Sequence, residues 1–287
     1  MNAKVKLGHI LKLAILLGLL SMIGDCSQFF FYPQKAFFQT PDDIGLTYED
    51  VYVTTQDNLT LHGWLLKAEK PKGIVFFLHG NAENISTHIQ SVAWLPDAGY
   101  EVVLMDYRGY GKSEGHPDLP DVFMDVEAFY KWLKSYSQSH NLSVTILGQS
   151  LGAAISSYYF GSLPKQKVIY QGIILDSVFS GYRAIAKDVL NQQYLTWPLQ
   201  FIVPHFLPKD YDPQQFVEQI APTPILFIHS PEDSIIPFQH GKTVYDKARS
   251  PKYWLTSQGS HIATFHFPVY QEAVLTFISN PESYLAP

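Results

Sequence analysis

The chain alternates between short, almost continuous apolar runs and longer stretches in which apolar residues recur with helical spacing. Five runs are typical of parallel strands covered on both faces: GIVFFLHG, YEVVLMDYRG, SVTILGQS, QGIILDSVF and PTPILFIHS. A later run, KYWLTS, is a weaker sixth candidate. Since strands and helices alternate, we expect an α/β fold with a mostly parallel central sheet flanked by helices.

Between these runs, helical spacing predicts helices at about 84–97, 119–137, 151–161, 237–248 and 268–279. In DVFMDVEAFYKWLKSY, for example, Val122, Val126, Phe129 and Leu133 fall on one face. Before the first parallel strand, the segment Asp50 to Leu66 has two alternating runs around QDN, a pattern that indicates a β-hairpin.

Composition narrows the possible partners. With 287 residues, 46% of them hydrophobic, the chain can bury one sizeable core. A formal net charge of -6 and the lack of a basic stripe argue against nucleic acid as a partner, because its phosphates need clustered Lys and Arg. The single cysteine, Cys26, excludes an intramolecular disulfide and a cysteine-rich zinc site.

The first 26 residues differ from the rest of the chain. Lys4, Lys6 and Lys12 precede the apolar run LAILLGLLSMI, which predicts a signal peptide or an uncleaved membrane anchor. Positive charges stay inside, so the rest of the chain is expected to be exported and membrane-associated, on the periplasmic side of a bacterial cell. An aromatic-rich extension follows at 27–46.

The residues around Cys26 resemble a bacterial lipoprotein signal, in which this cysteine is acylated and becomes the new N-terminus. Asp25 departs from that pattern, which prefers a small residue before the cysteine. Lipoprotein and signal anchor both attach the protein to the membrane through its N-terminal segment. The alternative is a soluble protein in which Cys26 is an ordinary thiol.

The motif GQSLG, from Gly148 to Gly152, directly follows an apolar strand and begins a helix. This is the context of a nucleophile elbow, a strained turn that exposes a serine hydroxyl at the carboxyl edge of the sheet. The alternative is a serine that only packs or caps the helix. Strand, turn and helix together favour Ser150 as a nucleophile.

A serine hydroxyl is a weak nucleophile near neutral pH, so Ser150 needs a general base and a carboxylate that orients the base. Two acids downstream lie at strand ends, Asp176 and Asp233, and the residues alone leave both open. The histidine candidates are His205, His229, His240, His261 and His266. His261 lies in a loop between KYWLTS and the last helix, where its side chain could reach the sheet edge.

Five motifs together resemble the α/β-hydrolase superfamily in order and spacing: LHGNAEN, DYRGYGKSEG, GQSLG, HSPEDSIIP and GSH. More narrowly, they are similar to small serine hydrolases of the Bem46-like and acyl-protein thioesterase-like branch. The resemblance covers roughly Thr47 to Asn280 and implies an α/β-hydrolase fold with a small lid segment at about 180–220. The catalytic domain would then span 47–287.

The resemblance also implies roles for individual residues. Ser150 matches the nucleophile, Asp233 the acid and His261 the base, with Asp176 left as a hydrogen-bonding residue at a strand end. The backbone N–H groups of Asn81 and Leu151 match the oxyanion hole, which stabilises the negative oxygen of a tetrahedral intermediate. No cofactor and no metal are implied.

Other polar residues of these motifs are expected to be structural. His79 is interpreted as a loop-organising residue that hydrogen-bonds to backbone. Asp106 and Arg108, with the glycines at 109, 111 and 115, are interpreted as turn and ion-pair chemistry. Glu83 and Asn84 are expected to begin the next helix.

The resulting prediction is a serine hydrolase that cleaves carboxylic esters or thioesters in a small-molecule or acylated substrate through an acyl-enzyme. A serine peptidase of aminopeptidase type on the same fold is the first alternative. A non-catalytic binding module on a hydrolase fold is the second.

Overall fold

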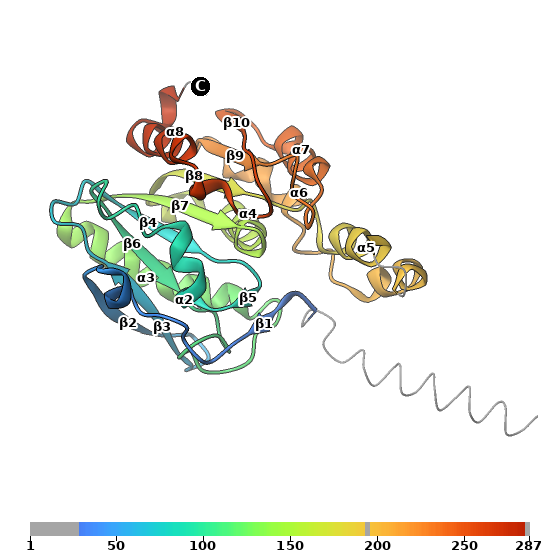
Figure 1. Cartoon of the computed structure of the whole chain (residues 1–287), viewed down its shortest axis with the longest axis horizontal. Helices are drawn as coiled ribbons and strands as arrows, with labels where there is room; N and C mark the ends of the chain where they lie inside the picture. The colour runs from blue at the N-terminus through green and yellow to red at the C-terminus, as the bar shows by residue number, and fades with distance from the viewer. Residues whose placement is uncertain (1–28, 193–195, 285–287) are drawn as a thin grey trace, which may run out of the picture.

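Within the described residues, 29–192 and 196–284, the structure, a computed structural model, contains one sheet of eight strands in the order β10-β9-β8-β7-β4-β6-β3-β2 (Figure 1). The strands are β2 (Tyr48–Thr54), β3 (Thr60–Leu66), β4 (Gly73–Leu78), β6 (Tyr100–Met105), β7 (Ser143–Gln149), β8 (Tyr170–Asp176), β9 (Ile225–His229) and β10 (Lys252–Thr256). Neighbouring strands from β10 to β6 are parallel, whereas β3 pairs antiparallel with both β6 and β2. The six predicted strands and the hairpin are confirmed.

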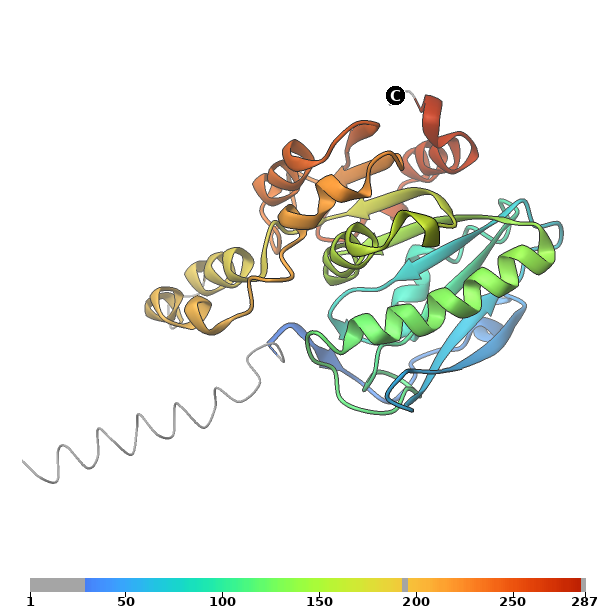
Figure 2. The ribbon, with the colours of Figure 1, turned by 180° about the vertical axis from the view of Figure 1, so that it is seen from behind.

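Helices cover both faces of the sheet, as Figures 1 and 2 show from opposite sides. The α-helices are α2 (Ile85–His88), α3 (Val122–His140), α4 (Leu151–Ser162), α5 (Tyr182–Gln192), α6 (Pro213–Phe216), α7 (Phe238–Lys247) and α8 (Pro268–Ser279). One buried cluster contains residues of α3, α4 and α7, and the other contains residues of α2 and α8. Within β4, Phe76 belongs to the first cluster and Phe77 to the second, because successive strand residues face opposite sides.

The helix expected at 84–97 is shorter than predicted, and that prediction was wrong in extent. The helix α2 ends at His88 and continues only as the 3₁₀ turn η3 (Ile89–Ser91). Pro96 has no N–H and disfavours the helical backbone conformation of the residue before it. Residues 92–99 therefore form turns, in which Val92 and Leu95 are fully buried. The other four helices lie within three residues of their predicted ends.

The register of the sheet brings the carboxyl ends of its parallel strands to one edge. Leu78 at the end of β4 pairs with Gly148, and Gln149 at the end of β7 pairs with Asp176. At the far strands, His229 pairs with Thr256. The loops that follow β4, β7, β9 and β10 therefore start side by side.

The segment between β8 and β9 contains α5, η5 (Trp197–Phe201) and η6 (Val203–Phe206), which project from the body of the protein in both views (Figures 1 and 2). It exposes large apolar side chains, namely Val189, Trp197, Leu199, Phe201, Ile202 and Phe206. A lid is predicted at about 180–220 within this segment, so we call it the lid segment; its action as a lid stays a prediction.

The predicted signal or anchor at residues 1–26, with Cys26, lies outside the described residues. Among the helices that are described, none combines the length and the apolar character that a membrane crossing requires.

Candidate active site

Ser150 lies in the sharp turn between β7 and α4. Its backbone has φ 55° and ψ -117°, a sparsely populated positive-φ conformation that costs a non-glycine residue on the order of 1–3 kcal/mol. The two motif glycines make the turn possible. A Cβ at Gly152 would lie 2.0 Å from the carbonyl oxygen of Leu78, and one at Gly148 would lie 2.6 Å from that of Gly152. The strand-turn-helix geometry of a nucleophile elbow is therefore present.

A chain of two hydrogen bonds joins Ser150 to His261 and Asp233. The Ser150 Oγ lies 2.9 Å from His261 Nε2, and His261 Nδ1 lies 2.7 Å from Asp233 Oδ2. Ser150 and Asp233 are buried, and the His261 side chain retains 17% of its exposure. Residues that are 111 and 28 positions apart in the chain thus meet at the carboxyl edge of the sheet.

The Asp233 carboxylate is held from both sides. Its Oδ1 accepts hydrogen bonds from the backbone N–H groups of Ile235 and Ile236, both at 2.9 Å. Burial by itself raises the pKa of Asp233, but the hydrogen bond and charge of His261 and these two N–H groups outweigh burial. The pKa of Asp233 consequently lies below its ordinary value, which keeps the carboxylate ionised beside His261.

Asp176, the other acid considered from the sequence, makes different contacts. Gln149 Nε2 donates to its Oδ2 at 2.8 Å, and Thr264 Oγ1 donates to its Oδ1 at 3.1 Å. Burial raises the pKa of Asp176 to about 6, while these two hydrogen bonds oppose the shift. Asp176 hydrogen-bonds at the end of its strand and holds the beginning of η8 (Thr264–His266), close to His261.

The two residues whose backbone groups are expected in the oxyanion hole are Leu151, directly after Ser150, and Asn81, in a loop close to it. Leu151 is the first residue of α4, so its N–H has no partner within the helix. The loop that contains Asn81 lies against the serine, because a Cβ at Gly80 would be 3.8 Å from Ser150 Cβ. Among the described residues, the N–H of Asn81 donates to no backbone carbonyl in the turns and loops.

His79 and Asp106 are both buried beneath this loop. His79 Nδ1 donates to the carbonyl of Gly80 at 2.8 Å, which confirms its loop-organising role. Burial lowers the pKa of His79 and raises the pKa of Asp106 to about 8, so both groups are mainly neutral near pH 7. Asp106 accepts the N–H of Ile85 at 2.9 Å and thereby also supports the start of α2.

The structural expectations for Arg108, the glycines and Asn84 are confirmed, whereas that for Glu83 was wrong, since Glu83 lies in the short strand β5 (Ala82–Glu83) and not at the start of α2. Arg108 pairs with the buried Asp125 at 2.8 Å and with Asp57 at 3.0 Å. Asn84 is the N-cap of α2, with its side chain accepting the N–H of Ser86. The three glycines of the Arg108 loop have left-handed backbones, with φ values of 84°, 46° and 81° at positions 109, 111 and 115.

Sequence reasoning did not anticipate the residues that hold the Asn81 carbonyl. The Tyr110 hydroxyl donates to it at 2.6 Å, and the N–H of Tyr32 donates to it at 2.8 Å. Tyr110 belongs to the motif DYRGYGKSEG, which the sequence indicates as turn and ion-pair chemistry. Tyr32 comes from the aromatic-rich extension, and no local pattern relates it to a loop fifty residues later.

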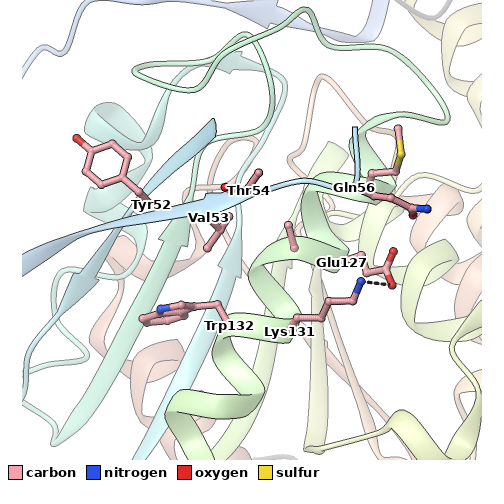
Figure 3. Close-up of a pocket in the computed structure, with 9 residues that line it drawn as sticks. Tyr52, Val53, Thr54, Gln56, Glu127, Lys131 and Trp132 are labelled. Carbon is pink, nitrogen blue, oxygen red and sulfur yellow. Dashed lines mark ion pairs between the residues drawn. The ribbon is translucent and has the colours of Figure 1, made fainter. Parts of the chain in front are cut away.

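A surface hollow of about 280 Å³ lies elsewhere, between β2 and α3 (Figure 3). Tyr52 and Trp132 line it, together with the ion pair between Glu127 and Lys131 at 2.9 Å. None of the three hydrogen-bonded residues at the sheet edge reaches it.

The sequence of this chain is similar to a known protein family and to individual bacterial proteins. The family model described as serine aminopeptidase, S33, matches residues 69–219. The uncharacterized protein YfhR of Escherichia coli K12 is 31% identical over 260 residues, covering 87% of this chain and 86% of that protein. The chain belongs to this family of α/β hydrolases.

Two further similarities concern the branch of the superfamily and the fold. Protein bem46 of Schizosaccharomyces pombe is 24% identical over 202 residues, covering 69% of this chain and 64% of that protein. The crystallised esterase Pf2001 of Pyrococcus furiosus has a TM-score of 0.68 at 20% identity, covering 86% of this chain and 95% of that chain. The predicted α/β-hydrolase fold and the resemblance to the Bem46-like branch are therefore confirmed.

The elbow generates a stability prediction. Gly152→Ala places a methyl group on the Leu78 carbonyl, and since the obstacle is backbone, α4 must move away from β4. We expect the free energy of unfolding to fall by about 3 kcal/mol or more, measured by urea denaturation. Ala154→Gly in the same helix is the control for helix propensity and should cost only about 1 kcal/mol plus a small packing loss. An equal loss for both variants would contradict the close approach.

The raised pKa of Asp176 generates a pH prediction. The folded protein binds this proton more tightly than the unfolded chain does, since the pKa rises from 3.8 to about 6 on folding. Its contribution to stability is therefore present below pH 3.8 and is lost as the pH rises toward 6. Between pH 5 and pH 7, the free energy of unfolding of Asp176→Asn should therefore rise by about 1.4 kcal/mol relative to that of the wild type.

Urea denaturation at both pH values measures this gain. The exposed Asp97→Asn variant controls for the loss of a carboxyl group from the surface. A stability difference between Asp176→Asn and the wild type that does not change with pH would contradict the assigned shift.

Proposed function

We propose that the protein is a serine hydrolase that cleaves carboxylic esters or thioesters through an acyl-enzyme. The observation that carries the proposal is the hydrogen-bonded chain from Ser150 through His261 to Asp233, with distances of 2.9 Å and 2.7 Å. A histidine that contacts a serine hydroxyl with one nitrogen and a carboxylate with the other is the arrangement that nucleophilic catalysis by serine requires.

In the proposed first step, Ser150 Oγ attacks the carbonyl carbon of the substrate while His261 Nε2 takes the hydroxyl proton. The Asp233 carboxylate accepts the Nδ1–H of His261 and stabilises the positive charge that forms on the ring. His261 then returns the proton to the leaving alcohol or thiol as the tetrahedral intermediate collapses. A water molecule, activated by the same histidine, releases the acid and regenerates the hydroxyl of Ser150.

The negative oxygen of the tetrahedral intermediate would lie between the N–H groups of Asn81 and Leu151. Both groups are backbone donors beside Ser150, and the Leu151 N–H lies at the N-terminus of α4, where the helix dipole favours negative charge. These steps involve only groups of the chain, the substrate and water.

The lid segment supports a small-molecule or acylated substrate with an apolar acyl group. Residues 189–208 contain no Asp, Glu, Lys or Arg, and several of their large apolar side chains are exposed. If this segment covers the site, such an apolar surface suits an acyl chain better than a charged substrate. The fold neighbour Pf2001 is itself named an esterase.

An aminopeptidase is the second candidate, because the matching family model is described as serine aminopeptidase. The same serine chemistry would then act on an aminoacyl bond, and the enzyme would need a group that recognises the free amine. A panel of p-nitrophenyl esters, acyl thioesters and aminoacyl anilides, compared by kcat/KM, separates the two functions.

We also propose that the N-terminal segment attaches the enzyme to a membrane on its exported, periplasmic side. The support is the lysine-flanked apolar run before Cys26 in the sequence. Phe29, which follows this segment, is exposed, and Phe30 packs against Tyr182 at the start of α5. The apolar side chains of the lid segment would then lie near the same membrane.

Removing the side chain of Ser150 or of His261, between which the proton moves, should abolish most of the hydrolase activity. We expect Ser150→Ala and His261→Ala to lower kcat by at least about 10³-fold, since the oxyanion hole alone gives only residual catalysis. Asp233→Asn should also be severe, because it removes the charge that orients and stabilises the histidine. Ester hydrolysis and labelling by a fluorophosphonate probe measure these effects.

Asp176→Asn is the matched control for the acid, since Asp176 is buried nearby but hydrogen-bonds to Gln149 and Thr264. It should retain most of the turnover and the labelling. If Asp176→Asn abolished turnover while Asp233→Asn was nearly silent, the assignment of the acid would be wrong. Fluorophosphonate labelling that persists in Ser150→Ala would exclude Ser150 as the nucleophile.

Membrane attachment is tested by fractionating cells that express the full chain or a version that starts at Ser27. The full chain should be found with the membranes and released by detergent, whereas the shortened chain should not. Palmitate labelling that disappears in Cys26→Ser would select the lipoprotein form over the anchor. Recovery of the full chain in the soluble fraction without detergent would contradict the attachment.

A further inference from the structure

Residues 30–36, which we call the strap, run beside the loop that contains Asn81. Their short strand β1 (Tyr32–Pro33) pairs in parallel with β5 (Ala82–Glu83). The N–H of Tyr32 donates to the Asn81 carbonyl at 2.8 Å, and the N–H of Gln34 donates to the Glu83 carbonyl at 2.9 Å. A segment from the beginning of the described chain thus supplies backbone hydrogen bonds to the loop beside Ser150.

The Asn81 carbonyl accepts a second hydrogen bond from the fully buried Tyr110, whose hydroxyl lies 2.6 Å away. A carbonyl oxygen has two lone pairs, so the strap and Tyr110 together use its full capacity as an acceptor. Two donors that approach from different elements restrict how the peptide after Asn81 can rotate. That peptide is directly attached to the residue whose N–H faces the proposed oxyanion.

This loop needs support from outside. Asn81 is exposed, and Glu83 has φ 62°, a left-handed conformation that costs a residue of this kind about 1–2 kcal/mol. A strained and exposed segment keeps such a conformation only when surrounding contacts impose it. The hydrogen bonds from the strap act on both sides of the strained stretch.

The strap is itself firmly held. The Asn84 side chain, which is buried, donates to the carbonyls of Gln34 at 2.9 Å and Ala36 at 2.8 Å. The N–H of Gly111 donates to the same Gln34 carbonyl at 3.0 Å. Phe31 belongs to the main buried cluster, so the strap packs on the core as well as on the loop.

We propose that the strap and Tyr110 position the oxyanion hole, which makes the aromatic extension a part of the active site. This inference rests on the proposed serine hydrolase function. Tyr32 acts through its backbone N–H and Tyr110 through its hydroxyl, and both hold the Asn81 carbonyl so that the N–H of Asn81 keeps its direction. They are positioning residues and do not touch the substrate.

The inference predicts which kinetic constants change. The strap makes no hydrogen bond to Ser150, His261 or Asp233 in the described structure, so the proton path stays intact when the strap is loosened. A misdirected N–H weakens binding of the negative oxygen, which forms only in the transition state. The loss should therefore appear in kcat and leave KM almost unchanged.

The first test compares Tyr32→Pro with Tyr32→Ala in the full chain in detergent. Proline removes the N–H that Asn81 accepts, whereas alanine removes only the exposed ring and keeps the N–H. With a soluble p-nitrophenyl ester, Tyr32→Pro should lower kcat by about tenfold and change KM by less than about twofold. Tyr32→Ala should have a kcat close to that of the wild type.

A second variant avoids any distortion by proline. Tyr110→Phe removes the other donor to Asn81 and should also lower kcat by about tenfold. Tyr130→Phe is its matched control, because the Tyr130 hydroxyl is part-buried and donates to the backbone carbonyl of Lys167 at 3.0 Å, away from the site. Thermal unfolding of all four variants separates loss of stability from loss of kcat.

A trifluoromethyl ketone gives a readout that a purely structural role would not change. The Ser150 Oγ bonds to its carbonyl carbon, the π electrons move to the oxygen and the hydroxyl proton passes to His261, so the adduct carries a negative oxygen. Its inhibition constant should rise about tenfold in Tyr32→Pro and in Tyr110→Phe, in parallel with the fall in kcat. Both controls should bind it like the wild type.

The outcomes separate the two proposals. Equal kcat values and equal inhibition constants for Tyr32→Pro and Tyr32→Ala, with Tyr110→Phe also unchanged, would overturn the role of the strap while Ser150→Ala remained inactive. Turnover that survives in Ser150→Ala would overturn the proposed function itself. A rise in KM with constant kcat would also contradict the inference, because it indicates a role in substrate binding.

Discussion

The arrangement of the site depends on the strained backbone of Ser150. A strand can turn into a helix within one residue only if that residue adopts positive φ and if its neighbours leave room for the crossing. Here the absence of a side chain at Gly152 lets α4 touch the carbonyl of Leu78 in β4. The turn is held by a hydrogen bond from the Ser150 N–H to the carbonyl of Asp176 at 2.9 Å. The Ser150 side chain thereby lies at the carboxyl edge of the sheet, where the loops after β4, β9 and β10 also begin.

The loops around the serine are joined to one another as well as to the sheet. Glu232, next to Asp233, accepts the N–H of Gly259 in the loop that contains His261 at 3.1 Å. Thr264 connects the far end of that loop to Asp176. The carboxyl groups of Asp233 and Asp106 differ in charge because they accept different numbers of hydrogen bonds. Three donors keep the pKa of Asp233 low, whereas Asp106 has one backbone donor and a pKa of about 8.

The strap, which lies outside the five motifs, contacts the loop beside Ser150. The strap contacts the Asn81 loop through its backbone, and its first residue, Phe30, packs on Phe179 and Tyr182 at the base of the lid segment. The strap, the loop that contains Asn81 and the base of the lid segment are therefore neighbours in space. A change in how the extension packs would act on the lid segment and the loop together, because the extension contacts the first through the Phe30 ring and the second through its backbone.

Local patterns in the sequence were sufficient for the strands, for four of the five expected helices and for the elbow at Ser150. Periodicity and turn glycines express short-range physics, and the residues that produce them are neighbours in the chain. The helix expected at 84–97 failed for a local reason as well, since Pro96 and the burial of Val92 and Leu95 favour turns.

The choice between Asp176 and Asp233 could not be made from local patterns, because both acids end strands of the same sheet. The resemblance to known hydrolases favoured Asp233, and the folded chain brings its carboxylate to His261 while Asp176 faces Gln149 and Thr264. The catalytic role of Asp233 stays a proposal. The pairing of Tyr32 and Tyr110 with Asn81 was decided only by the tertiary structure. Such contacts join residues tens of positions apart, and they depend on how strands, loops and the extension pack together, which no periodicity along the chain records.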